Sequence, residues 1–164
     1  MNKFLLLFCF CSSGIISCSQ TKYGIKHVYA FFSLHMPGNI LVDENGRPLQ
    51  KGPVILNIIY VETSAKDIQW TTAWQNGKKY SVSTTRITEL PFEVGRKKIN
   101  NGKIVLSPAP GNKLWVLRLE PEEGAKGPSI KTKNGEIILE GRYEGRKFFR
   151  KINDQTELYV PPSV

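Results

Sequence analysis

The sequence predicts an all-β protein, most simply an antiparallel β-sandwich of immunoglobulin-like or transthyretin-like type, with a small β-barrel as the alternative. Four Asn-Gly pairs punctuate the chain, at positions 45–46, 76–77, 101–102 and 134–135, and each adjoins a run rich in β-branched and aromatic residues. Asn-Gly between such runs is the strongest short-range signal of a β-hairpin. No stretch shows a long helical period, which leaves strands as the main element.

The first 18 residues read as an export signal rather than as part of the fold. Lys3 precedes an uninterrupted apolar run at residues 4–10, and small residues follow at positions 12–14. A membrane-spanning helix needs ~20 apolar residues, so this segment is too short and resembles a cleaved signal peptide. We therefore expect a signal peptide at residues 1–17, a lipidated tether at 18–24 and a single β domain at 25–164.

The end of this segment, Ile15-Ile16-Ser17-Cys18, resembles the lipobox of bacterial lipoproteins, although that family usually has a small residue where Ile16 stands. The resemblance implies that Cys18 becomes the first mature residue, carries diacylglycerol on its sulfur and is acylated, typically with palmitate, on its amine. Two or more acyl chains give stable membrane anchoring. Because residue 19 is serine and not aspartate, the resemblance also implies sorting to an outer membrane if the cell has one. Residues 20–22 carry no acidic run, which argues against display on the cell surface and favours the periplasmic face. An ordinary secretory signal and an N-terminal core strand are the alternatives.

The remaining chain divides into short β-prone runs between Gly-rich and Pro-rich joints. Residues 25–36 are apolar on both faces, which is typical of a strand covered on both sides. The further predicted strands are residues 39–42, 54–63, 68–74, 79–87, 103–106, 113–119, 136–143, 146–152 and 156–160.

The hairpin around Asn76-Gly77 admits two registers. A two-residue turn would place Trp74 opposite Lys79, whereas a three-residue loop with Gly77 in a bulge would place Trp74 opposite Lys78. The second register gathers Ile68, Trp70, Trp74, Tyr80 and Val82 on one face, which burial favours, so it is the register we predict.

Residues 38–54, with Val42-Asp43, Gly46, Pro48-Leu49 and Gly52 in sequence, resemble the opening of carboxypeptidase-regulatory-like β-sandwich modules. A fainter similarity continues to residue 82, with Lys51 inserted and a long spacing from Val54 to Gly77. The resemblance implies a sandwich of seven or more strands with an accessory or adhesive role, and it carries over no catalytic residue. Independently of the family, Asp43 is placed to bond the turn backbone and Gly46 to take a positive φ.

Composition points to an anionic partner rather than to a redox or metal site. The chain has 23 basic and 14 acidic residues, a formal net charge of +9. Such a charge favours lipid headgroups or acidic polysaccharides, while a solvated surface is the plain alternative. All three cysteines lie in residues 1–18, so the mature domain would hold no disulfide. We expect no cofactor, no metal and no nucleic-acid partner.

The most basic stretch surrounds two phenylalanines near Glu144-Gly145. Alternation along residues 146–152 sends Phe148 to one face and Phe149 to the other. Charged residues of this kind protect the edge of a sheet, and they are also a candidate patch for an anionic surface. The patch residues are Arg142, Arg146, Lys147, Arg150 and Lys151.

Catalytic signatures are weak. His27 and His35 share a parity but lie ~26 Å apart along a strand, too far to share a metal. Glu62 with Asp67, or Glu140 with Glu144, is the remaining candidate for a glycosidase pair. Trp70 and Trp74 are a candidate carbohydrate platform, with burial in the core as the plainer interpretation.

From these observations we expect a non-enzymatic, lipid-anchored envelope protein that acts as an accessory or interaction module. Its partner would be another envelope protein, an anionic lipid or a polysaccharide. A carbohydrate-binding module using exposed tryptophans is the alternative, and a glycoside hydrolase is a more remote one.

Overall fold

The computed structural model describes residues 22–35, 42–47, 54–65, 67–122 and 130–161. The described chain is almost entirely β, which confirms the predicted fold class. Its single helical segment is the three-residue 3₁₀ turn η1 (Lys22–Gly24), so no helix in these ranges is long or apolar enough to cross a membrane. The lipobox and Cys18 lie outside the described residues.

Eight strands form one curled sheet in the order β10-β1-β2-β7-β4-β3-β8-β9, and two more form a small second sheet. All pairs are antiparallel except β1 with β10, which is parallel. The strands of the large sheet are β1 (Ile25–His35), β2 (Val54–Thr63), β3 (Ile68–Gln75), β4 (Lys78–Ile87), β7 (Lys113–Pro121), β8 (Ile137–Tyr143), β9 (Arg146–Ile152) and β10 (Thr156–Glu157), and those of the small sheet are β5 (Phe92–Arg96) and β6 (Lys103–Leu106).

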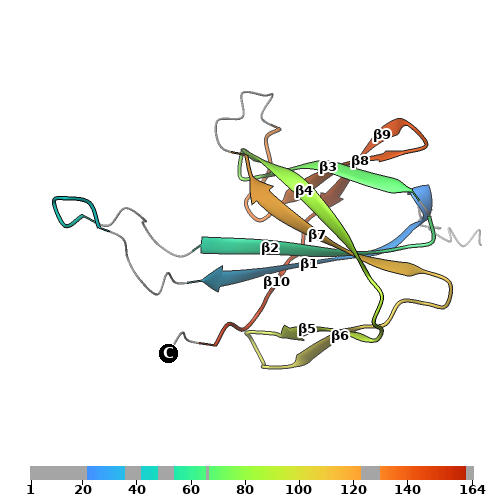
Figure 1. Ribbon diagram of the computed structural model, residues 1–164, viewed down its shortest axis with the longest axis horizontal. Helices are drawn as coiled ribbons and strands as arrows, with labels where there is room; N and C mark the ends of the chain where they lie inside the picture. The colour runs from blue at the N-terminus through green and yellow to red at the C-terminus, as the bar shows by residue number, and fades with distance from the viewer. Residues whose placement is uncertain (1–21, 36–41, 48–53, 66, 123–129, 162–164) are drawn as a thin grey trace, which may run out of the picture.

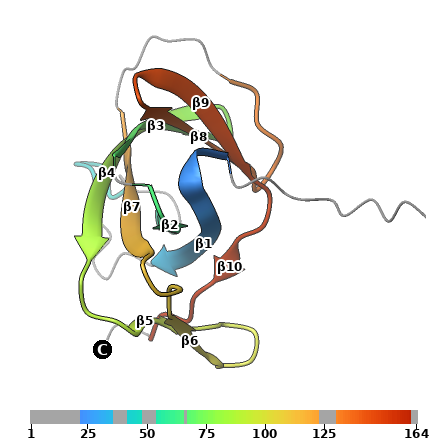
Figure 2. The same cartoon turned by 90° about the vertical axis from the view of Figure 1, so that its right-hand side faces the viewer.

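The large sheet curls into a half-barrel. Seen from one end, it runs from β8 and β9 at the top, through β4 and β7 at the side, to β2 and β1 in the centre (Figure 2). The concave face of this sheet encloses the larger core. Side chains alternate between the two faces along each strand, so the strands of the large sheet direct apolar side chains to the concave side. The buried members of this core are Ile25, Ala30, Ile59, Val61, Trp70, Ala73, Leu117, Ile137, Leu139, Phe148 and Ile152.

The convex face of β1, β2 and β7 carries a second core, which the small β5–β6 sheet covers (Figure 1). Phe31, Tyr60, Leu114 and Val116 pack there against residues of the small sheet, including Ile104. Strand β1 is therefore buried on both faces, with Ala30 in the inner core and Phe31 in the outer one. This confirms the prediction made from its apolar sequence.

Most predicted strands have the predicted position, and β2, β6 and β9 also have the predicted bounds. Strand β5 was not predicted, and its five residues include Glu93 and Gly95. Predicted strand 39–42 lies largely outside the described residues. The Asp43 carboxylate accepts hydrogen bonds from the backbone N–H groups of Asn45 (2.9 Å) and Arg47 (2.8 Å), and Gly46 has φ +74°, as predicted for this turn.

The predicted register at Asn76-Gly77 is wrong. Trp74 pairs with Lys79 and Gln75 with Lys78, so the turn contains two residues. Asn76 and Gly77 have φ values of 51° and 72°, and two consecutive positive φ angles match the twist of a two-residue hairpin. A bulge between Trp70 and Thr72, opposite β8, reverses the alternation inside β3. Trp70 therefore reaches the inner core without the predicted three-residue loop.

The chain is fixed to the domain from Lys22 onward, within the predicted tether. The Tyr23 ring stacks on Phe148 of β9 at a centroid distance of 4.4 Å. The carbonyl of Gly24 accepts hydrogen bonds from the Ser64 N–H (2.9 Å) and the Thr63 hydroxyl (3.0 Å). Turn η1 thus joins the end of β2 to the free edge of β9.

Candidate functional site

The basic patch predicted from the sequence lies on β8 and β9, and β9 is the last strand of the large sheet. The register places Arg146 and Arg150 on the side of Phe148, and Lys147 and Lys151 on the side of Phe149. Phe148 is buried in the inner core, whereas 55% of Phe149 is exposed. The charged residues therefore flank a free sheet edge, the position in which Lys and Arg hinder edge-to-edge aggregation.

Two of the five cations have acidic partners. Lys147 Nζ lies 2.8 Å from a Glu140 carboxylate oxygen, and Lys151 Nζ lies 2.7 Å from Glu136. Both glutamates are buried, so the lysines neutralise carboxylates that would otherwise be costly to desolvate. The other three cations form no ion pair within the described ranges and are exposed to solvent; they are Arg142, Arg146 and Arg150.

Two of the unpaired arginines, Arg142 and Arg146, lie at the same end of the half-barrel as turn η1, whereas Arg150 lies further along β9, opposite Leu139. Arg142 and Arg146 flank the two-residue turn Glu144-Gly145, and Tyr23 contacts the Tyr143 ring at the base of that turn (6.0 Å between centroids). Figure 2 shows the blue start of β1 beneath the red β8–β9 hairpin. A side-chain hydrogen bond with Glu144 is the main cause that raises the pKa of Tyr143.

The two tryptophans proposed as a ligand platform do not share a face. Trp70 is in the inner core, in edge contact with Phe148, while Trp74 lies on the convex side against Phe149. Both are buried, with 7% and 6% of their surface exposed. The Trp74 indole N–H is buried and has no hydrogen-bond acceptor in the described part of the chain. Neither ring is available for stacking on a sugar in this conformation.

The candidate acids are held by structural contacts. Glu62 is buried and accepts hydrogen bonds from the backbone N–H of Ala109 and the side-chain amide of Asn112, which fixes the loop before β7. Glu140 is bound by Lys147. The described residues contain no group of three histidine, cysteine or acidic side chains arranged to hold a metal.

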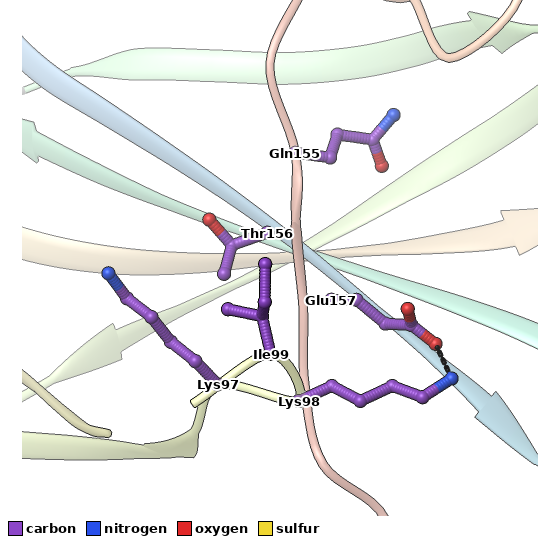
Figure 3. Close-up of a pocket in the computed structure, with 6 residues that line it drawn as sticks. All are labelled: Lys97, Lys98, Ile99, Gln155, Thr156 and Glu157. Atoms are coloured by element: carbon purple, nitrogen blue, oxygen red, sulfur yellow. Dashed lines mark hydrogen bonds and ion pairs between the residues drawn. The ribbon is translucent and has the colours of Figure 1, made fainter. Parts of the chain in front are cut away.

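A surface hollow of about 650 Å³ lies between the loop after β5 and strand β10. Figure 3 shows Ile99 rising between Lys97 and Thr156, while Lys98 reaches across to Glu157. The Lys98–Glu157 ion pair spans 2.7 Å, and the Lys98 N–H donates to the Glu157 carbonyl at 3.0 Å. These contacts fasten the small sheet to the edge of the large one, which gives the hollow a structural role.

A smaller pocket, of about 300 Å³, opens at the end of the half-barrel opposite η1. Two amides, Asn57 of β2 and Gln75 of β3, are each 7% exposed and face one another across the concave side. Asn57 Nδ2 donates to Gln75 Oε1 at 2.8 Å, and Gln75 Nε2 lies 3.4 Å from Asn57 Oδ1. We call this pocket the barrel mouth; its lining residues are Ile55, Asn57, Gln75, Asn76, Lys78 and Tyr80.

Sequence reasoning missed the barrel mouth. The one available signal was Asn57, a single polar residue inside the apolar run 54–61 and on the inward parity of β2. Its partner Gln75 is 18 residues away, and the pairing depends on the order of strands around the curl.

Comparison of the chain with protein-family models, with curated proteins and with solved structures finds no match. Function is therefore argued from the surfaces described above.

Proposed function

We propose that this chain is a lipid-anchored interaction module that presses its β8–β9 hairpin against an anionic envelope surface and performs no chemistry itself. The proposal combines the lipobox resemblance at Cys18 with the exposed arginines of the hairpin. We further propose that the anchor lies in an outer membrane and that the domain faces the periplasm.

The observation that carries the proposal is the stack of Tyr23 on Phe148. It fixes the start of the described chain beside the hairpin, and Cys18 is four residues before Lys22. Four extended residues reach at most ~14 Å, so a lipid on Cys18 would keep the hairpin close to the headgroups.

Charge supports the same orientation. Arg142, Arg146 and Arg150 have no acidic partner among the described residues, so their charge is free to act on an external anion. A basic side chain near an anionic bilayer contributes about 1 kcal/mol to the free energy of binding. A lipid anchor would already confine the domain to the membrane, so a few such contributions would be enough to orient it.

Vesicle binding tests the proposal. A chain that begins at Ser19, and so lacks the lipid, is mixed with vesicles of phosphatidylcholine alone or with added phosphatidylglycerol, and bound protein is measured by flotation. We expect binding only to the anionic vesicles and its loss in high salt. The double variant Arg142→Glu/Arg146→Glu should lose at least ten-fold in affinity.

The matched control is Lys131→Glu/Lys133→Glu, which makes the same change in net charge on exposed residues. These lysines lie near the other end of the half-barrel, where the Thr132 hydroxyl accepts a hydrogen bond from the Gly77 N–H (3.4 Å). Equal losses in the two double variants would show a non-specific charge effect and contradict the proposed orientation. Absence of binding to anionic vesicles would instead favour a protein partner, to be sought by pull-down.

A further inference from the structure

The barrel mouth differs from the β8–β9 hairpin in that it contains a buried pair of amide side chains, Asn57 and Gln75. It lies where the concave face opens to solvent between β2, β3 and β4, and the mouths of β-barrels are common ligand sites. Its volume of about 300 Å³ is at the lower end of the range of small-molecule pockets. Any occupant is therefore a small molecule or the end of a chain.

The amides at its base have donors to spare. Each amide group offers two N–H donors, and the reciprocal pair between Asn57 and Gln75 uses only one from each side chain. Within the described chain neither side chain has another hydrogen-bond partner, although each is more than nine-tenths buried. A buried donor without an acceptor costs free energy, so a ligand that presents acceptors to these N–H groups would be stabilised.

The charge of the pocket selects an anion. Lys78 lies at the rim, forms no ion pair among the described residues, and no acidic side chain is among those that line the mouth. The Tyr80 side chain also lines the mouth, and its hydroxyl adds a donor. The Lys78 ammonium, the second N–H groups of the two buried amides and the Tyr80 hydroxyl are all able to donate, which fits the oxygens of a carboxylate.

The walls provide an apolar contact for the rest of the ligand. Ile55 is 53% exposed at the entrance, an unusual position for a large aliphatic side chain on an inward-facing parity. The ring of Tyr80 packs against the inner core and presents its other surface to the mouth.

We propose that the barrel mouth binds a small carboxylate with a short apolar tail. The carboxylate is held by Lys78 and by the free amide N–H groups of Asn57 and Gln75, and the tail lies between Ile55 and Tyr80. This site is independent of the hairpin and of the lipid anchor.

Isovalerate and isovaleramide are suitable probes, because they have the same shape and differ in charge. The full chain, labelled with ¹⁵N and held in detergent micelles, is titrated with each while the side-chain NH₂ signals of Asn57 and Gln75 are followed by NMR. We expect isovalerate to shift these signals in a saturable way and isovaleramide to shift them at least ten-fold more weakly. Lys78→Gln should weaken isovalerate binding about ten-fold or more, the value of a charge-assisted hydrogen bond.

The control is Lys79→Gln, which changes the adjacent lysine in the same way. Lys79 pairs with Glu122 at 2.8 Å and does not line the mouth, so its removal should leave the isovalerate titration unchanged. Three outcomes would each overturn the proposal: no shift at tens of millimolar isovalerate, equal shifts with the two probes, or equal weakening by the two lysine substitutions.

Discussion

Gly141 on β8 is the position where the addition of one methyl group should have the largest effect on the fold. It lies opposite Phe148 on β9, and a Cβ at Gly141 would be 2.6 Å from Phe148 Cζ, 2.9 Å from Phe148 Cε1 and 3.2 Å from Trp70 Cε3. Carbon atoms do not approach so closely, so Gly141→Ala requires the Phe148 ring to move. The ring is confined between Tyr23 and Trp70, at centroid distances of 4.4 and 5.4 Å.

The loss of stability can be estimated from the contacts that the Phe148 ring loses when it moves. Overpacking a core with one methyl group costs about 1–3 kcal/mol, and disturbing the stack with Tyr23 costs a further ~0.5–1.5 kcal/mol. Alanine lowers the conformational entropy of the unfolded chain relative to glycine, which stabilises the folded state by ~0.4–1 kcal/mol. We therefore expect Gly141→Ala to lower the free energy of unfolding by about 2 kcal/mol, the middle of the range of ~0.5–4 kcal/mol that these contributions span.

Urea unfolding followed by circular dichroism measures this change, and a second substitution tests its cause. In a Phe148→Leu background the ring is gone, so adding Gly141→Ala should cost at least 1 kcal/mol less than it does in the wild type, a coupling typical of residues in contact. If Gly141→Ala is neutral, or if the two changes are additive, the close approach of Gly141 and Phe148 does not limit stability and the reasoning fails.

Two further predictions concern a turn and the tyrosines. Gly145→Ala should destabilise the domain by ~1–2 kcal/mol in urea unfolding, because φ is +75° there and no atom lies within 4 Å of an added Cβ, so the penalty is one of backbone conformation. Gly145→Asn should cost clearly less, since asparagine tolerates this region, and equal losses would point to another cause. Burial is the main cause that raises the pKa values of Tyr29, Tyr60 and Tyr80 above 10.0. A raised pKa means that the folded state holds these protons more tightly, so stability is intact below pH 10 and declines as the pH rises through the folded-state values. Phenolate absorbance should therefore continue to increase well above pH 10 and end in unfolding, and a titration complete near pH 10 in a folded protein would contradict this.

Local sequence signals predicted much of the fold. Strands β2, β6 and β9 were found with their bounds because each is a β-prone run between turn residues. The burial of both faces of β1 followed from its lack of alternation. The assignment of residues 146–152 to a charged sheet edge also followed from composition, and β9 is indeed the outermost strand.

Features that depend on distant strands could not be predicted. The bulge in β3 at Trp70/Thr72 is defined by its pairing with β8, about 70 residues later in the chain, and it decided which way the tryptophans face. Periodicity within β3 alone favours a shared face, and that is why the predicted hairpin register was wrong. The barrel mouth was hidden for the same reason, since β2 and β3 are not neighbours in the sheet.

The turn of the β8–β9 hairpin and the barrel mouth lie at opposite ends of the half-barrel. The carbonyl of Gly24, at the η1 end, is bound by Thr63, whereas Asn57 pairs with Phe32 further along β1. Thr63 is six positions after Asn57 on β2, a distance of ~20 Å along the strand. A lipid on Cys18 that holds the hairpin against a bilayer would therefore point the barrel mouth away from it. The mouth would then be open to solutes or chain ends in the aqueous compartment and not to lipid headgroups.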